Sequence, residues 1–280
     1  MPFHSNLRRC LLTASGLLVA PTVAPAQISV TGSTTYTQTF DTLPITGSTT
    51  FNQFTSATPT LPGWFAVRTA NGTGSDQIVA GNGASNAGGL YSFGTGTSTD
   101  RALGSVGSGG TAGGSLAWGV VFRNDDTVPV NATVSYTGEQ WRLGTTGFSK
   151  KVSFAYSTTA TAPTILSLIP AGSGGQPPAG FISFPTLDFT SPATSGTVGA
   201  LDGNLSVNQL QHSNAVLNVG LAPGQHLTFY WSDPDHPGTD HGMAIDDVKV
   251  VFVPVPEPVT CFGLAAAGMV ADRVIRRRFR

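Results

Sequence analysis

The densest group of polar side chains in the sequence lies in one stretch near its C-terminal end, SDPDHPGTDHGMAIDD (232–247). Carboxylates at near-alternate spacing in a loop with Gly and Pro are typical of a Ca²⁺ site, because this ion takes about six to eight oxygen ligands in a flexible geometry. The spacing differs from that of an EF-hand loop. The stretch supplies Asp233, Asp235, Asp240, Asp246, Asp247, His236 and His241.

The strand expected after this loop also places a carboxylate beside apolar side chains. By alternation, one of its faces is expected to carry Ala244, Asp246, Val248, Val250 and Phe252. A carboxylate at the rim of a core is costly unless it is paired or bound to a metal. Asp41 follows Phe40 in the first expected strand, and it would meet Asp246 if the first and last strands pair. We therefore predict a structural Ca²⁺, with candidate ligands Asp41, Asp233, Asp235, Asp240 and Asp246.

Two alternatives stay open for these residues. The aspartates could instead cap turns by accepting hydrogen bonds from backbone amides, a common role for Asp in loops. His236 and His241 could bind zinc, although solvated histidines are the commoner occupants of such a loop.

Glu139 is the one glutamate between residues 27 and 253, and it lies in TGEQWR beside Trp141 and Arg142. This set could bind or cleave a sugar, but glycoside hydrolysis usually needs two carboxylates about 5–10 Å apart, and the sequence identifies no second one. We expect Glu139 to form a salt bridge with an arginine and so join two strands. The four tryptophans could instead form a surface platform on which a sugar stacks. Three of them lie in strand-like runs, however, and this favours a place in the core. The four are Trp64, Trp118, Trp141 and Trp231.

The sequence lacks the residues that several other kinds of chemistry require. No G-x-S-x-G nucleophile motif is present, and the five histidines are scattered along the chain. Cys10 and Cys261 lie in the two terminal segments, so the body between them has no cysteine for a disulfide framework or a zinc cluster. Between residues 28 and 253, thirteen acidic side chains outnumber seven basic ones. This excludes the basic footprint that nucleic acids require.

The elements that must position these residues are short strands. Three runs alternate apolar and polar residues with a period of two, LAWGVVFRN (116–124), KVSFAYS (151–157) and HLTFYWSD (226–233). Gly-rich segments separate such runs, and the 280-residue chain contains 35 Gly, 19 Pro and only 10% charged residues. Gly and β-branched residues lose more in a helix than in a sheet. We therefore predict an all-β single domain over 27–253, a β-sandwich of the jelly-roll type.

Both ends of the chain resemble export signals. Residues 1–26 combine Arg8 and Arg9 with an apolar stretch and end in Ala24-Pro25-Ala26, which predicts a signal-peptide helix cleaved between Ala26 and Gln27. Residues 254–280 begin with a Pro-rich segment, continue with a short apolar helix of 13 uncharged residues, and end in a basic cluster. A full span needs about 20 apolar residues. The cluster would stay on the cytoplasmic side of the inner membrane, and it consists of Arg273, Arg276, Arg277, Arg278 and Arg280.

The order of Pro256-Glu257-Pro258, an apolar segment and terminal arginines resembles the PEP-CTERM sorting signal of exported bacterial proteins. The resemblance implies that an integral-membrane enzyme, an exosortase, processes the protein and delivers it to the cell surface or the extracellular matrix. Asp272-Arg273 interrupts the apolar run, which is a departure from the family pattern. A plain tail anchor that holds the protein in the membrane is the alternative.

The body resembles a group of PEP-CTERM proteins with a lectin-like, concanavalin-type sandwich. The matching stretches are Phe40-Asp41, DRALGS (100–105), YTGEQWR (136–142) and the closing WSDPDHPGTDHGMAIDDVKV (231–250). We expect an exported, non-enzymatic surface or matrix protein that binds polysaccharide. The alternatives are a matrix component without a ligand and a secreted glycan-active enzyme that uses Glu139 with an aspartate.

Overall fold

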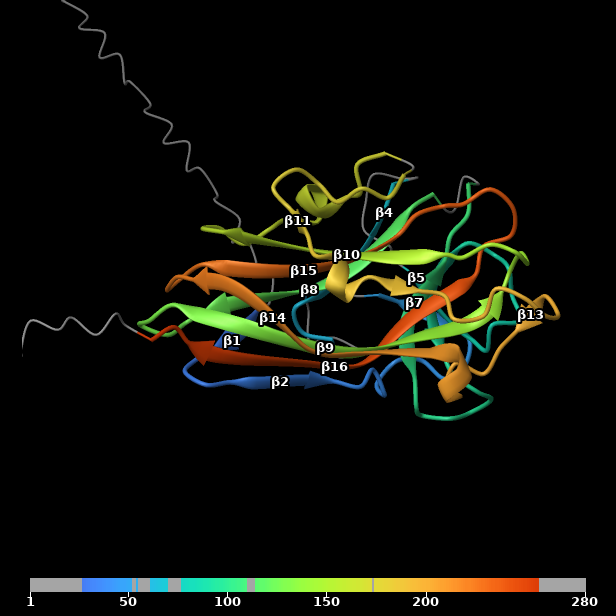
Figure 1. Cartoon of the computed structure of the whole chain (residues 1–280), viewed down its shortest axis with the longest axis horizontal. Coiled ribbons are helices and arrows are strands. Elements are labelled where there is room, and N and C mark those ends of the chain that lie inside the picture. The colour runs from blue at the N-terminus through green and yellow to red at the C-terminus, as the bar shows by residue number, and fades with distance from the viewer. Residues whose placement is uncertain are drawn as a thin grey trace, which may run out of the picture.

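The computed structural model of the chain describes residues 27–51, 54, 61–69, 77–109, 114–172 and 174–256. Its strands form two sheets that pack face to face, so the body is an all-β sandwich (Figure 1). Among the described residues the helices are three short 3-10 turns, η1 (Ile165–Leu168), η2 (Pro185–Leu187) and η3 (Ser206–Asn208). None of them is long and apolar enough to cross a membrane. The predicted signal and sorting helices lie outside the described residues.

One sheet has seven strands and forms the upper layer in Figure 1. Its strands follow one another in the order β1 (Ile28–Val30), β8 (Leu116–Asn124), β15 (His226–Asp233), β10 (Lys151–Thr159) and β11 (Ile182–Ser183), with β12 (Phe189–Thr190) paired to β10 and β4 (Trp64–Arg68) paired to β8. The three alternating runs of the sequence are strands, as their patterns predict. The structure shows that they are neighbours at the centre of this sheet.

The other sheet has nine strands. Its order is β13 (Gly199–Ala200), β9 (Val130–Leu143), β16 (Gly242–Pro254), β7 (Ala102–Val106), β6 (Gly89–Phe93), β5 (Gln77–Gly81) and β3 (Ser48–Thr50), with β14 (Gln209–Leu221) paired to β9 and β2 (Thr35–Gln38) paired to β16. The early strand β2 thus pairs with the last described strand, and Val248 lies opposite Gln38.

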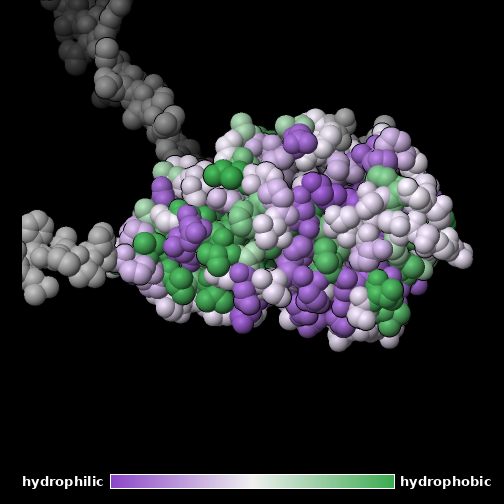
Figure 2. Space-filling view, in the orientation of Figure 1, coloured by the Kyte–Doolittle hydropathy of each residue, from purple (hydrophilic) through white to green (hydrophobic). Residues whose placement is uncertain are grey.

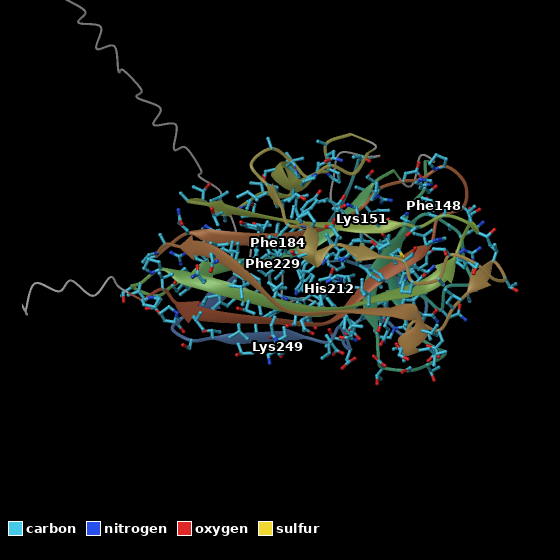
Figure 3. All side chains as sticks on the ribbon, viewed as in Figure 1. Phe148, Lys151, Phe184, His212, Phe229 and Lys249 are labelled. Carbon is cyan, nitrogen blue, oxygen red and sulfur yellow. The ribbon has the colours of Figure 1, made fainter. Side chains whose placement is uncertain are left out.

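The main core lies between the sheets and is rich in aromatic side chains. Trp231 stacks on Trp64 with ring centroids 6.0 Å apart, and its edge meets Phe154 and Tyr136. Figure 3 shows Phe229 between the two layers and Lys249 on the outer side of the lower one. The opposite face of the seven-stranded sheet is also buried in part, because Tyr230 and Phe65 pack there under Leu168 of η1. Both faces of β15 are therefore inaccessible to solvent.

The last strand departs from the predicted alternation at one residue. Asp247 has a positive φ of 49°, and the pairing of β16 with β9 shifts register between Asp246 and Lys249. This β-bulge inserts an extra residue, so the side chains on its two sides change faces. Ile245 and Val248 both face the main core, whereas Ala244 joins a separate cluster on the outer face with Trp141. The predicted shared face of Ala244, Asp246 and Val248 is therefore wrong.

Candidate functional site

The outer face of the seven-stranded sheet carries an open trough, which we call the β10 trough. It consists of two adjoining pockets of about 390 and 430 Å³ that share Ala179, Gly180 and Phe181. Strand β10 and the segments 161–164, 167–168 and 174–181 line it, together with Ser183, Tyr230, Ser232 and Pro234. These volumes fall within the range of roughly 300–1,000 Å³ that small-molecule sites occupy.

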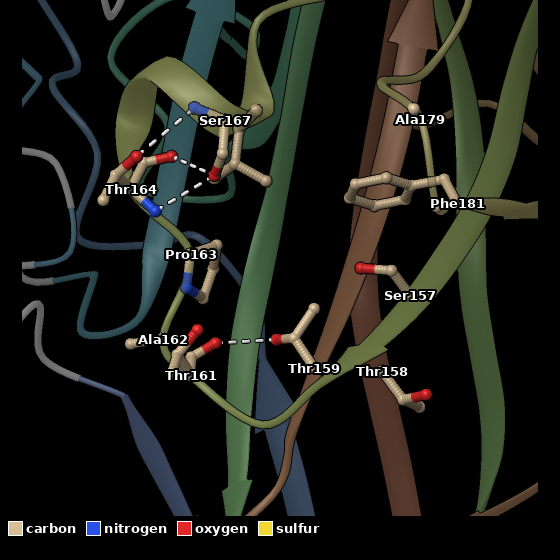
Figure 4. Close-up of a pocket in the computed structure, with 12 residues that line it drawn as sticks. Ser157, Thr158, Thr159, Thr161, Ala162, Pro163, Thr164, Ser167, Ala179 and Phe181 are labelled. Atoms are coloured by element: carbon tan, nitrogen blue, oxygen red, sulfur yellow. Dashed lines mark hydrogen bonds between the residues drawn. The ribbon is translucent and has the colours of Figure 1, made fainter.

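The segment before η1 is held in place by its own polar side chains. Thr164 caps η1 by accepting a hydrogen bond from the backbone N–H of Ser167, and the Ser167 hydroxyl accepts one from the N–H of Thr164 in return (Figure 4). This reciprocal arrangement is a capping box. The Thr159 hydroxyl donates to the carbonyl of Thr161 and fixes the turn that leads into the segment. One wall of the trough is thus ordered by local contacts.

The lining of the trough combines hydroxyl groups with one aromatic ring. The ring of Phe181 is half-buried and packs at 5.0 Å, centroid to centroid, on Tyr230 beneath it. Three hydroxyls on the trough side of the sheet make no side-chain hydrogen bond within the described part of the chain, those of Ser153, Ser157 and Ser183. Each can donate one hydrogen bond and accept two. The trough can therefore hydrogen-bond a polyhydroxylated ligand while Phe181 contacts its apolar face.

Figure 2 shows one face of the molecule, on which polar and apolar residues are interspersed in small patches. This surface fits the sparse charge of the sequence, 10% of residues. At the edge of the β10 trough the amine of Lys151 is 2.9 Å from the Asp188 carboxylate, and the Lys151 side chain is exposed (Figure 3). Charge at the trough is therefore confined to its rim.

Two of the predicted calcium ligands are instead bound to a lysine. The amine of Lys150 lies 2.8 Å from Asp233 Oδ1 and also contacts Asp240, and all three side chains are inaccessible to solvent. Ser105 of β7, in the opposite sheet, donates a hydrogen bond to Asp233 Oδ2. Burial disfavours charge on Lys150, but the two carboxylates outweigh it and raise the pKa of Lys150 above its ordinary value. We call Lys150, Asp233 and Asp240 the buried triad.

Asp235 lies beside the triad and does not enter it. Burial, followed by the neighbouring Asp240, raises the pKa of Asp235. His241 is fully buried; its Nδ1 accepts from the Gly144 amide, and its Nε2 lies 3.1 Å from the Phe148 carbonyl. His236 stacks on Phe148. The structure therefore gives the zinc alternative no shared site for the two histidines.

The remaining carboxylates gather on the outer face of the nine-stranded sheet, where Glu139 of β9 and Asp246 of β16 lie on adjacent strands. Glu139 accepts hydrogen bonds from the Trp141 indole at 2.9 Å and from the Gln209 amide at 3.1 Å. Asp246 accepts one from the amide of Asp247 at 2.7 Å. Burial raises the pKa of Glu139 to about 7 and that of Asp246 to about 9, and the negative charge of Glu139 contributes to the shift of Asp246. We call Glu139 and Asp246 the outer pair.

The predicted salt bridge of Glu139 to an arginine is wrong, because Arg142 donates to the carbonyls of Gly83 and Ala84 instead. Asp41 is exposed and accepts a hydrogen bond from Thr39 at 2.9 Å. Within the described residues, no three Asp, Glu, His or Cys side chains are placed to hold a metal ion. The five predicted ligands are divided between two places, and calcium binding stays a prediction.

All four tryptophans are fully buried, which confirms their expected place in the core and rules out a surface platform built from them. The sequence did contain a signal for the lysine of the triad. Lys150 precedes Val152 and Phe154 at a spacing of two, so alternation already places it on the face that points into the core. The β10 trough had no comparable signal, because its other wall comes from the segments 161–164, 167–168 and 174–181, which have no regular period.

No protein-family model matches the chain, and no curated protein matches it. Among solved structures, it is similar to TmCBM61, a carbohydrate-binding module determined in complex with β-1,4-galactotriose. The two share 10% sequence identity with a TM-score of 0.25, over 56% of this chain and 72% of the module. A similarity of this size identifies neither a family nor a ligand.

Proposed function

We propose that the protein is an exported surface or matrix component that binds polysaccharide in the β10 trough and has no catalytic role. One observation carries the proposal: an open groove that combines unpaired hydroxyls with the half-buried ring of Phe181. Sugars present many donors and acceptors together with apolar C–H faces, and a lining of this kind complements both. The scarcity of charge in the groove favours a neutral glycan.

The binding experiment uses the purified full chain and the extracellular polysaccharide isolated from the native host. Titration calorimetry is expected to show saturable binding that Phe181→Ala weakens about tenfold or more. Ser153→Ala, which removes a partly exposed hydroxyl from the lining, should weaken it less. Ile182→Ala is the matched control, because Ile182 is the next residue, is 55% exposed and lies outside the lining. Equal affinity of the wild type and Phe181→Ala, or no binding at all, would refute the proposal.

The export part of the proposal rests on the two ends of the sequence. Strand β16 ends at Pro254, and the Val255 amide still donates to the Pro129 carbonyl at 2.8 Å, so the PEP motif begins directly beside the folded body. We propose that an exosortase-type enzyme processes the chain there while the apolar segment holds it at the inner membrane. The intact mass of the mature protein from each cell fraction tests this. Loss of residues 1–26 and of the arginine cluster is expected; a membrane-bound form that keeps the arginines contradicts it.

The outer pair favours the second candidate, a secreted glycan-active enzyme. It supplies the second carboxylate that the sequence did not identify, since Asp246 lies beside Glu139. Both side chains are nearly inaccessible, 3% and 5% exposed, and a sugar would have to displace Trp141 or Gln209 to reach them. We therefore prefer the binding function. Release of reducing ends from the host polysaccharide by the wild type, and not by Glu139→Gln, would reverse that preference.

A further inference from the structure

The geometry points to a covalent bond: we propose that the amine of Lys150 and the carboxyl of Asp233 condense to an amide, an isopeptide cross-link, with Asp240 as the proton shuttle. The three side chains are brought together from different elements. Lys150 directly precedes β10, Asp233 ends the neighbouring strand β15, and Asp240 lies in the loop before β16.

Proximity is the first requirement of this reaction, and the fold supplies it. Strands β10 and β15 are antiparallel neighbours with Ser153 opposite Ser232, so Lys150 and Asp233 meet at the same end of the pair. The amine is 2.8 Å from Asp233 Oδ1, yet no donor within the described residues is aligned with that oxygen as a hydrogen bond. Oriented groups held in this way react with effective concentrations of about 10⁵ M or more.

Exclusion of water is the second requirement. Lys150 is 1% exposed, Asp233 0% and Asp240 3%. Gly107 closes the site, because a Cβ at that position would lie 2.8 Å from Lys150 Nζ and 3.1 Å from Asp240 Oδ2. Burial of an ion pair is costly in such surroundings, and a neutral amide removes that cost. A dry site also protects the amide from hydrolysis.

The reaction balances without any external reagent. Asp240 takes a proton from the ammonium group of Lys150 and passes it to Oδ1 of Asp233, so that a neutral amine lies beside a neutral carboxyl group and its lone pair can attack Cγ of Asp233. The hydrogen bond from Ser105 to Asp233 Oδ2 stabilises the negative charge that develops on that oxygen. Asp240 then carries a second proton from the nitrogen to Oδ1, which leaves as water. Of the three ammonium protons, two leave with the water and one stays on the amide nitrogen, while Asp240 is regenerated as the carboxylate.

High-resolution mass spectrometry of the denatured full chain tests the proposal. The intact mass is expected to be lower than the sequence mass of the same chain by one water, and digestion should yield one branched peptide that joins Lys150 to Asp233. Lys150→Arg and Asp240→Asn should each restore the missing water in essentially all molecules. Lys151→Arg, at the next residue, is the matched control and should keep the loss.

The design separates the cross-link from other losses of mass. An aspartate that cyclises on its own backbone, as at Asp202-Gly203, also loses water, but it would do so equally in Lys150→Arg. A water loss that persists in Lys150→Arg therefore overturns the proposal. So does a wild-type mass equal to that of the unmodified chain, or a branched peptide that joins any other pair of residues.

Discussion

The buried triad and the outer pair both hide two carboxylates from solvent, but only the triad has a cation between them. Asp233 and Asp240 are 0% and 3% exposed and share the amine of Lys150, whereas Glu139 and Asp246 are 3% and 5% exposed and are held by neutral donors. In the triad each charge has a partner. In the outer pair the pKa values rise to about 7 and 9. The difference shows that the fold places buried acid groups in two kinds of surroundings, beside a cation in the triad and beside neutral donors in the outer pair.

The largest expected effect follows from removing the cation of the triad. Lys150→Met would leave Asp233 and Asp240 buried together without a cation, and breaking such a pair costs about 3 to 5 kcal/mol of unfolding free energy. Loss of the proposed amide would add to this. Urea denaturation at pH 7 measures the change. A loss of unfolding free energy below about 1 kcal/mol would show that water reaches the triad. The contrast between a buried, paired triad and the outer pair would then not hold.

The next effect is the contribution of the outer pair to the pH dependence of stability. Glu139 and Asp246 bind protons more tightly in the folded state than in the unfolded one, where they titrate near 4.5 and 3.8. As pH rises the unfolded chain loses these protons first, so stability falls until pH passes the folded pKa values of about 7 and 9. Glu139 alone should contribute a fall on the order of 3 kcal/mol.

Denaturation at a series of pH values from 5 to 9 checks this slope. Glu139→Gln keeps an oxygen that can accept from Trp141 but does not titrate, so its stability should change less over this range, and Asp246→Asn should act in the same direction. Lys150→Arg is the matched control and should keep the slope of the wild type. A Glu139→Gln profile parallel to that of the wild type would mean that the outer pair is exposed to water in solution.

A smaller effect concerns the bulge that turns Asp246 toward the outer face. Asp247 has a positive φ of 49°, a conformation that glycine adopts without the penalty that a Cβ brings. Asp247→Gly and Asp247→Ala remove the same charge, so the difference between them isolates the backbone. Thermal melts should show the glycine variant to be more stable, by about 1 kcal/mol. Equal stabilities would indicate that the backbone relaxes and that the bulge is not fixed.

The smallest effect is expected at the residue next to the triad. Lys151 also contacts an aspartate, Asp188, but its side chain is 54% exposed. Ion pairs at the surface contribute about 0.2 to 1 kcal/mol at most. Lys151→Ala should therefore change the urea midpoint only slightly, and less so at high salt. A loss of unfolding free energy as large as that of Lys150→Met would show that burial does not explain the difference between the two lysines.

Much of the fold could be predicted from alternation, because the runs around Trp118, Phe154 and Phe229 repeat with the period of a strand. The bulge at Asp247 could not, since aspartate marks turns, caps and bulges alike and only the pairing of β16 with β9 shows the extra residue. Because the extra residue at Asp247 was not predicted, Asp246 was assigned to the same face as Val248, which is wrong. One inserted residue is enough to reverse which side chains enter the core.

The candidate sites were predicted less well than the fold. The dense run of aspartates from Asp233 to Asp247 suggested one metal site, but neighbours in sequence were divided between the interior and the outer face. The deciding partner was Lys150, which is 83 residues away from Asp233 and has no nearby acidic motif in the sequence. Pairing of that kind depends on tertiary packing and is invisible to local patterns. The β10 trough is likewise made by segments that only the sheet brings together.

The place of β16 has a mechanical consequence. The strand runs from Gly242 to Pro254 with β9 along one side and β7 and β2 along the other. Tension applied at its C-terminal end would act along the strand and load these interstrand hydrogen bonds together, in shear, instead of opening them one at a time. The body should therefore resist pulling at Pro254 better than pulling at the short edge strand β3.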